Sequence, residues 1–250
     1  MRLHDPDGFA RRAVIPLPTP VNAALLTLSP LLAGPAFTPE TLRRAGLYVI
    51  CLILAVTVHE FAHAYAAHKL GDGTPEAQGR LTLSPMAHAD PVGTLILPLI
   101  LALSPGGLLF GWGRPVQTQP RNYTRNVTMR GGMAIVAFVG PLSNLLQAAL
   151  VLAVVAGLSA GGVLTPTMYE PLALFFTLNL LLFAFNLVPI HPLDGGKVIS
   201  WILGPKWEPA DDFLARYGFI ILIVLVFSGL LGYLLTPVFN LGNAALAAVL

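Results

Sequence analysis

Five consecutive residues carry the most specific chemistry in the chain: His59, Glu60, Phe61, Ala62 and His63. Positions i and i+4 share one face of an α-helix, so both imidazoles can bind a single zinc ion. The glutamate between them is then held beside a water on that metal, as in a metal-dependent peptide hydrolase. Histidine and glutamate are scarce, so chance would supply this spacing about 0.003 times in a chain of this composition.

The motif lies inside an apolar stretch, which predicts a membrane-spanning helix over residues 45–70. Around His59, Glu60 and His63 the other polar side chains are small or ambivalent for about 20 residues, which is enough to cross a bilayer. Ionisable side chains at that depth are costly and usually serve a function. The expectation of catalysis is therefore higher than for the same motif on a soluble helix.

The composition also predicts an all-α, polytopic membrane protein. Hydrophobic residues make up 55% of the 250 and charged residues 10%, which is outside the range of soluble domains. The length allows about five to six transmembrane helices with short loops. The net charge of +2, without a run of basic residues, argues against nucleic acid as a partner, and the single Cys51 excludes an intrachain disulfide.

Apolar runs and helix breakers divide the chain further. The clearest spans are predicted at residues 45–70, 131–157, 172–189 and 213–235. Residues 13–37 are apolar but contain five prolines, which fits a broken or interfacial membrane segment. The tail, 237–250, is apolar but too short to cross. We accordingly expect an N-terminal segment at 1–44, a catalytic core at 45–200, and a C-terminal helix and tail at 201–250.

Two shorter segments between the first two spans are predicted to have other structures. Residues 93–112 are apolar but are interrupted by Pro98 and by a Ser-Pro-Gly-Gly sequence at 104–107, which indicates a re-entrant hairpin. Residues 80–84 alternate in polarity like a short β-strand. That strand could hold a substrate extended by pairing with it, a hypothesis in which Leu81 and Leu83 are essential for cleavage.

A catalytic zinc bound by two histidines needs a third protein ligand and an open position for water. The candidates at membrane depth are Asp194, His191, and less readily His68 or His88. Asp194 ends a segment in which two prolines unwind a helix end and two glycines permit close backbone approach. The residue types alone leave the choice between these candidates open.

Three motifs together resemble the site-2 protease family of intramembrane zinc metalloproteases. They are the His-Glu-x-x-His of residues 59–63, Gly-Pro-Leu-Ser-Asn at 140–144, and the segment from Asn186 to Gly196 that contains Pro-Leu-Asp-Gly-Gly. They occur in the family's order, and the stretch His88-Ala-Asp90-Pro91 resembles one found in the compact members that lack a PDZ domain. The resemblance implies His59, His63 and Asp194 as zinc ligands, with Glu60 as general base.

The same resemblance bears on two amides and on the partners. Asn144 and Asn186 lie in family motifs, so a donor to the oxyanion of the scissile carbonyl is as reasonable for them as a hydrogen bond between helices. The implied activity is peptide-bond hydrolysis in transmembrane protein substrates within the lipid bilayer, with one Zn²⁺ per chain. The implied location is a prokaryotic cell membrane, and the oligomeric state stays open.

The depth of the ligands constrains the topology, because zinc reaches only about 2 Å to each donor. Asp194 matches the depth of His59 and His63 only if the chain between Leu70 and Gly131 enters and leaves on one side of the membrane. Residues 69–130 then carry six Lys and Arg on that side. The positive-inside rule makes it cytoplasmic, so the site is predicted to open toward the cytoplasm.

Two other functions remain possible on the residues alone. A membrane zinc carrier or sensor could use the same histidine pair, but it has no need of Glu60 and usually shows a richer set of His and Asp along a pathway. A membrane protease that trims prenylated proteins also has this motif, with a downstream glutamate as third ligand. Glu76, Glu170 and Glu208 all fall outside the predicted spans, which disfavours that alternative.

Overall fold

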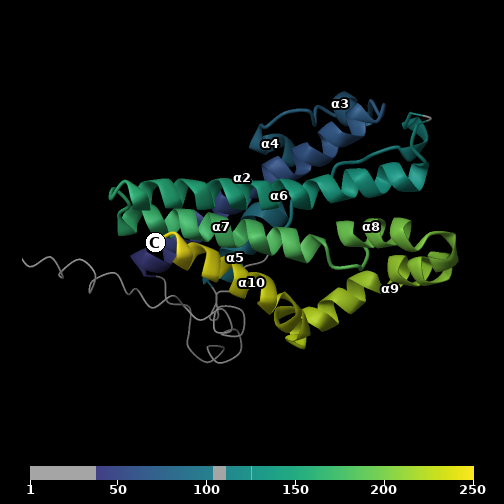
Figure 1. Cartoon of the computed structure of the whole chain (residues 1–250). Helices are drawn as coiled ribbons and strands as arrows, with labels where there is room; N and C mark the ends of the chain where they lie inside the picture. The colour runs from purple at the N-terminus through teal and green to yellow at the C-terminus, as the bar shows by residue number, and fades with distance from the viewer. Residues whose placement is uncertain (1–37, 104–110, 125) are drawn as a thin grey trace, which may run out of the picture.

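The computed structural model describes residues 38–103, 111–124 and 126–250, and these form a helical bundle (Figure 1). The long helices are α2 (Pro39–Lys69), α6 (Met129–Ala160), α7 (Pro166–Asn186), α9 (Glu208–Phe227) and α10 (Leu230–Ala248). The short ones are α3 (Thr74–Ala77), α4 (Pro85–His88), α5 (Leu97–Leu103) and α8 (Asp194–Leu203), with a π-helical turn at Pro91–Ile96 and 3-10 turns at Pro120–Asn122 and Pro205–Trp207. The described residues contain no β-sheet, which confirms the all-α class.

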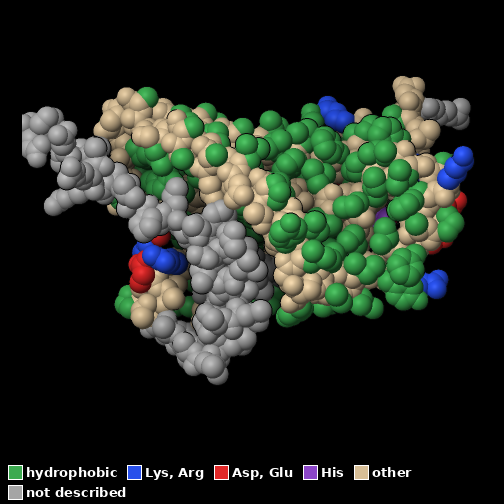
Figure 2. Space-filling model, turned by 60° about the horizontal axis from the view of Figure 1, so that its bottom comes forward, with side chains coloured by type: hydrophobic (Ala, Val, Ile, Leu, Met, Phe, Trp, Pro, Cys, Tyr) green, Lys and Arg blue, Asp and Glu red, His purple; other side chains and the backbone are tan. Residues whose placement is uncertain are grey.

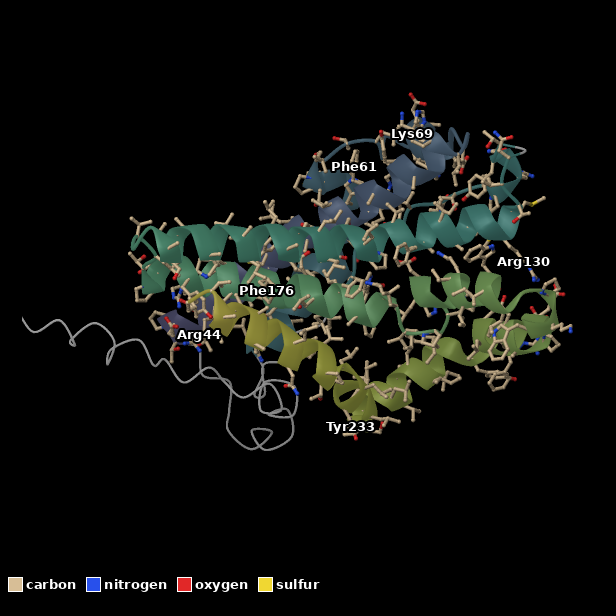
Figure 3. The ribbon with its side chains drawn as sticks, in the orientation of Figure 1. Arg44, Phe61, Lys69, Arg130, Phe176 and Tyr233 are labelled. Atoms are coloured by element: carbon tan, nitrogen blue, oxygen red, sulfur yellow. The ribbon has the colours of Figure 1, made fainter. Side chains whose placement is uncertain are left out.

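Helix α6 is the centre of the bundle, because it packs against α2, α7 and α8. In Figure 1, α6 and α7 run side by side, and α10 lies along α7. Buried alanines such as Ala55 and Ala137 allow the helix backbones to approach closely, as is usual for helices packed in a membrane. Phe176, labelled in Figure 3, belongs with Val155 and Leu246 to an apolar cluster that joins α6, α7 and α10.

Threonine caps set where the three longest helices begin. Thr38, Thr128 and Thr165 precede α2, α6 and α7, and each side chain accepts a hydrogen bond from a backbone N–H of the first turn, which would otherwise be unsatisfied. The starts of α2 and α7 also meet, since Arg43 pairs with Glu170 at 2.7 Å. Helices α2 and α7 therefore start at the same end of the bundle.

Four described helices are long and apolar enough to cross a membrane: α2, α6, α7 and α10. Large apolar side chains such as Leu146, Phe219 and Leu241 are exposed on the outside of the bundle. Figure 2 shows a face dominated by hydrophobic side chains, with few charged ones. A surface of this kind is stable in lipid, so the chain is a multi-pass membrane protein. The question of whether residues 13–37 cross lies outside the described residues.

The C-terminal region corrects two sequence predictions. Residues 213–235 do not form one span, because α9 ends at Phe227 and a new helix, α10, begins at Leu230. The break lies at Gly229, whose φ of 75° is left-handed, a conformation that glycine adopts at little cost. Residues 237–250, expected to be too short to cross, mostly belong to α10, a candidate span. The apolar pattern continues through the break and so conceals it.

The loop region between α2 and α6 corrects one expectation and supports part of another. The ends of the predicted hairpin meet, since Trp112 N–H donates to the Gly93 carbonyl at 3.0 Å and Ala89 pairs with Gly113 in an isolated antiparallel bridge. The turn expected at 104–107 lies outside the described residues. Residues 80–84 form bends and no strand. The alternating pattern requires Arg80 to face water as on the outer side of a strand. Instead Arg80 is only 4% exposed, and its guanidinium donates to backbone carbonyls of this loop.

Candidate metal centre

His59, His63 and Asp194 meet in the interior of the bundle. The three residues are 7%, 8% and 8% exposed, although they come from α2 and from the start of α8, more than 130 residues later in the sequence. The two Nε2 atoms are 3.0 Å apart. Asp194 Oδ2 lies 3.4 Å from His59 Nε2 and 3.1 Å from His63 Nε2.

These separations fit a zinc ion. With ligand distances near 2.0 Å, donor atoms of a tetrahedral zinc site lie about 3.3 Å from one another, close to the three values found. All three donor atoms point at one another, and two imidazoles with one carboxylate form a common ligand set for catalytic zinc. Among the described residues this is the one group of three or more His, Cys, Asp or Glu side chains whose donor atoms converge in this way.

Glycines provide the room for this convergence. A Cβ atom on Gly140 would lie 2.3 Å from two atoms of the His63 ring and 2.9 Å from the His59 ring. Gly140 therefore lets α6 pass directly over both imidazoles. A Cβ atom on Gly195 would lie 2.4 Å from the carbonyl oxygens of Leu187 and Val188, so this glycine allows the first turn of α8 to pack on the end of α7 and to present Asp194.

A chain of hydrogen bonds fixes the orientation of His59. Its Nδ1 lies 2.6 Å from Asn144 Oδ1, and Asn144 Nδ2 donates to Asn179 Oδ1 at 2.9 Å. Asn179 Nδ2 in turn donates to the Phe175 carbonyl at 2.9 Å. The Phe175 carbonyl can only accept, so Asn179 must turn its N–H₂ group toward it and its oxygen toward Asn144. Asn144 then donates to that oxygen and presents its own oxygen to His59. His59 then carries its proton on Nδ1 and leaves the Nε2 lone pair for a metal.

His63 is oriented in the same way by the backbone. Its Nδ1 lies 2.7 Å from the Val136 carbonyl of α6, which again assigns the proton to Nδ1 and the free lone pair to Nε2. Sequence reasoning missed both Val136 and Asn179. A backbone carbonyl leaves no trace in a sequence, but Asn179 could have been noticed as a second amide in an apolar span, 35 residues after Asn144.

Glu60 faces a different neighbour from the two histidines. It is 8% exposed, and its Oε2 accepts a hydrogen bond of 3.1 Å from the Val116 N–H. Val116 belongs to the non-helical segment 113–119, which packs closely on α2, since a Cβ atom on Gly113 would lie 2.3 Å from Val56 and 3.3 Å from Glu60. The glutamate is therefore held next to the metal ligands by this segment.

The two amides proposed as oxyanion donors have different surroundings. Asn144 is fully buried, and both ends of its amide bond to protein atoms. Asn186 is half-buried at the end of α7, and its Nδ2 donates to the Leu182 carbonyl at 2.9 Å. One N–H of Asn186 has no assigned acceptor among the described residues. Asn186 is thus the better placed of the two to act as a donor.

The other histidines considered as ligands have separate partners. His191 Nε2 lies 2.8 Å from Asp211 Oδ1 of α9. His68 lies 3.4 Å from Glu76 at the end of α2, and the Nε2 of the buried His88 lies 2.7 Å from the Thr82 carbonyl. None of the three joins the cluster formed by His59, His63 and Asp194 among the described residues. The structure brings Asp194 to the two histidines.

Two buried histidines and a glutamate in the candidate span α2, joined by an aspartate at the start of α8, define the class of membrane zinc metalloproteases. The comparisons with known proteins agree. The model of peptidase family M50, the site-2 protease family, matches residues 157–225. The chain is 38% identical over 200 residues to "Putative zinc metalloprotease YwhC" of Bacillus subtilis, which covers 78% of this chain and 86% of the relative. The chain belongs to the site-2 protease family.

A second relative gives the same result. "Putative zinc metalloprotease Rip2" of Mycolicibacterium smegmatis is 31% identical over 241 residues, covering 89% of this chain and 82% of the relative. The Rip2 protein of Mycobacterium tuberculosis is 28% identical over 225 residues. No solved structure gives a significant match. The membership confirms a zinc-dependent metallopeptidase and Zn²⁺ as its cofactor.

Proposed function

We propose that this protein is an intramembrane endopeptidase that hydrolyses peptide bonds of transmembrane protein substrates. The observation that supports it is the location of the cluster. His59 and His63 lie in α2, and the residues that orient them lie in α6 and α7, all three being candidate membrane spans. Residues 45–200 would form the catalytic core, with His59, His63 and Asp194 as the zinc ligands.

Zinc bound by these three residues would activate a water molecule and polarise the scissile carbonyl. Glu60 is the only other carboxylate that the motif places beside them, and it would take the proton from the attacking water and deliver it to the leaving amine nitrogen. The Val116 N–H hydrogen bond holds Glu60 in position for this transfer.

Different roles follow for the two amides. Asn186 would donate a hydrogen bond to the developing oxyanion, for which it keeps an N–H. Asn144 would act as a positioning residue, because its oxygen holds the proton on His59 Nδ1. These assignments separate two residues that the sequence motifs suggest as equivalent.

The substrate must be locally extended before hydrolysis, because a helix hides its carbonyls in hydrogen bonds. Residues 80–84 are bent and therefore a poor template for pairing. The non-helical segment from Gly113 to Val116 lies beside Glu60 and already makes one β-bridge to Ala89. We place the pairing with substrate at this segment.

Access from the cytoplasm is supported by the distribution of charge. The chain between α2 and α6 leaves and re-enters the bundle at one end, and Lys69 and Arg130 lie toward that end in Figure 3, away from Arg44. Arg80, Arg114 and Arg121 belong to the same connection. Basic residues collect on the cytoplasmic side of membrane proteins, so the site would open there.

The decisive experiment is Glu60→Gln in the purified protein. We expect one zinc per chain in both forms, chelator-sensitive cleavage of transmembrane peptides by the wild type, and cleavage lowered by at least about a thousandfold in the variant, because proton transfer is lost. A zinc carrier or sensor would keep its transport or binding after the same change. Cleavage that survives the loss of Glu60, or a protein that binds no zinc, would refute the proposal.

A further inference from the structure

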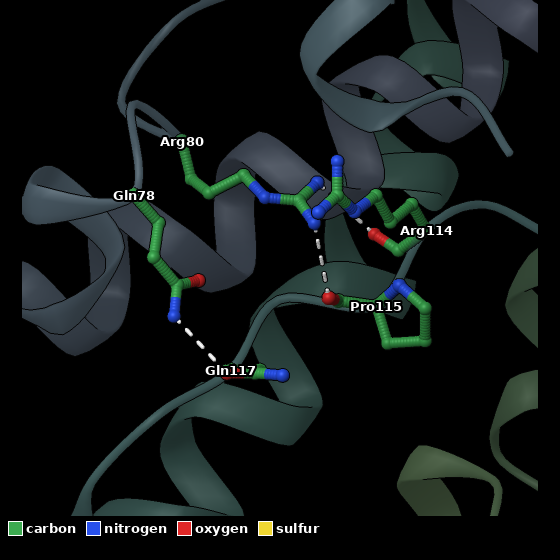
Figure 4. Close-up of a pocket in the computed structure, with 5 residues that line it drawn as sticks. All are labelled: Gln78, Arg80, Arg114, Pro115 and Gln117. Atoms are coloured by element: carbon green, nitrogen blue, oxygen red, sulfur yellow. Dashed lines mark hydrogen bonds between the residues drawn. The ribbon is translucent and has the colours of Figure 1, made fainter.

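A cavity of about 460 Å³ in the connection between α2 and α6 is lined by two arginines. Its lining consists of Gln78, Arg80, Arg114, Pro115 and Gln117. Figure 4 shows the guanidinium groups of Arg80 and Arg114 close to one another on one side of this cavity. The two glutamines are joined by a hydrogen bond of 3.1 Å from Gln78 Nε2 to Gln117 Oε1, so Gln117 keeps its amide N–H₂ group for another partner.

Arg80 is an unusual arginine because it is buried without a carboxylate. It is 4% exposed, and its guanidinium donates to the carbonyls of Ala87, Arg114 and Pro115. No carboxylate lies within 4.0 Å of Arg80 or Arg114 in the described parts of the chain. Burial, and then the charge of Arg114, lower the pKa of Arg80 below its ordinary value. Two unpaired cations facing one cavity favour an anion there.

The cavity is near the site of hydrolysis. Arg80 Nη2 bonds to the Pro115 carbonyl at 3.3 Å, and the next residue, Val116, donates to Glu60. The charge of Glu60 also acts on Arg80, in the sense opposite to that of Arg114. The Pro115 carbonyl and the Val116 N–H belong to one peptide group, so Arg80 Nη2 lies no more than about 9 Å from Glu60 Oε2, a distance that about three residues of an extended peptide span.

We propose that Arg80, Arg114 and Gln117 form a subsite for a carboxylate of the substrate, an Asp or Glu side chain within about four residues of the scissile bond. This inference rests on the proposed function. A guanidinium matches a carboxylate with two parallel hydrogen bonds, and a partly buried site strengthens them. The peptide is favoured over a lipid headgroup as occupant because the subsite lies on the same segment, 113–119, that holds Glu60.

Peptides that differ at one position would test the subsite in the full-length protein in lipid nanodiscs. Glu, Gln or Lys is placed in turn at each of the four positions on either side of the scissile bond of a cleaved transmembrane peptide. At one position the wild type should prefer Glu to Gln by about tenfold in kcat/KM, the effect of one charge-assisted hydrogen bond. Arg114→Gln should reduce that ratio to about one, and Arg114→Glu should reverse it in favour of Lys.

Arg114 suits this test because its side chain is exposed, so its replacement spares the fold, whereas Arg80 supports the loop. Arg121→Gln is the matched control, since Arg121 is exposed, carries the same charge and lies outside the cavity. It should keep the wild-type preference. A wild type without preference for Glu at any of the positions, or a preference that persists in Arg114→Glu, would overturn the subsite.

Equilibrium binding separates this proposal from the proposed function. Labelled Glu and Gln peptides are titrated into zinc-loaded Glu60→Gln protein, with and without Arg114→Gln. A preference for the Glu peptide that depends on Arg114, found together with a zinc-loaded wild type that cleaves none of the peptides, would refute the peptidase and leave the subsite intact. If Arg114→Gln slows all peptides equally, and only in nanodiscs with anionic lipid, the arginines bind lipid phosphate and the subsite proposal is wrong.

Discussion

The metal centre and the C-terminal pair of helices are built on different principles. Around His59 and His63 the buried polar groups are linked in a chain that ends on backbone carbonyls, those of Phe175 and Val136. Apart from Asp211 of α9, which pairs with His191, helices α9 and α10 instead pack through apolar clusters, and the Thr236 hydroxyl donates to the Gly232 carbonyl of its own helix. A polar network requires one geometry, whereas an apolar contact tolerates repacking. The two regions should therefore respond differently to equivalent substitutions.

The largest effect is expected at Asp194. Asp194→Ala leaves two imidazoles, so zinc affinity should fall by more than about a hundredfold and hydrolysis should be lost. Zinc content after dialysis against a weak chelator measures this. His191→Ala is the matched control, because His191 pairs with Asp211 of α9, and it should retain a full zinc complement. A reversed result, with His191 needed for metal and Asp194 dispensable, would show that the third ligand is wrong.

Two glycines allow the same substitution in both regions. Gly140→Ala places a methyl group 2.3 Å from the His63 ring, which the hydrogen bond to Val136 holds in place. We expect zinc binding and activity to fall by at least about tenfold. Gly242→Ala in α10 meets the end of the Leu180 side chain at 2.4 Å, which can rotate, and the edge of the Phe176 ring at 3.3 Å. It should change stability by less than about 1 kcal/mol and keep zinc. Equal effects of the two substitutions would contradict the comparison.

Asn179 tests the polar chain one step away from the metal. Asn179→Leu removes the closer acceptor of Asn144 Nδ2 and leaves it only the Ala55 carbonyl at 3.5 Å, so the oxygen of Asn144 is held less firmly toward His59. Zinc affinity or kcat should fall by about 10- to 100-fold, as for other residues that orient metal ligands. Thr236→Val in α10 also deletes a polar group and should leave both quantities unchanged. If zinc affinity in Asn179→Leu equals that of the wild type, Asn179 has only a packing role.

The smallest effect is expected at the loop end of the bundle, at Asp72. Burial would raise the pKa of this carboxyl, but hydrogen bonds from Gln119 N–H, Thr74 and Asn122 lower it below its ordinary value. A lowered pKa in the folded state stabilises the protein above the unfolded pKa of about 3.9, and this contribution is lost as the pH falls through the folded value. Thermal unfolding should therefore depend less on pH below 4 in Asp72→Asn than in the wild type. Parallel curves for the two proteins would refute this.

The histidine pair of the metal centre could be predicted from the sequence because its spacing is short-range, whereas Asp194 was singled out among several candidates by the resemblance to the site-2 protease family. The i, i+4 spacing places His59 and His63 on one face of a helix, and two glycines after Asp194 mark a close approach. Membrane depth then constrains how distant segments combine. Asn179 and Val136 escaped prediction because their roles depend on which residues of α6 and α7 face each other. Such register between helices is a property of tertiary packing.

The predictions for the C-terminal region and the loop failed for a related reason. One apolar run covers both α9 and α10, and a left-handed Gly229 divides it without any change in hydropathy. Alternation at residues 80–84 indicates a strand only if Arg80 faces water, but Arg80 is buried and bonds to carbonyls of the loop. In the C-terminal region the backbone conformation of one residue, and in the loop the side-chain conformation of one residue, determines a structure that the hydropathy pattern does not show.

The lengths of α2 and α6 have a consequence for the membrane itself. With 31 and 32 residues, at 1.5 Å per residue, these helices are about 46–48 Å long, against a hydrocarbon layer of about 30 Å. The excess must be taken up by tilt, by protrusion into the headgroups, or by deformation of the surrounding lipid. His59 and His63 lie in the second half of α2, so the distance from the aqueous boundary to the zinc ligands is set by that adjustment. If hydrolysis takes place within the membrane as proposed, we expect acyl-chain length to control it, because thinner bilayers bring the cluster closer to water and thicker ones isolate it.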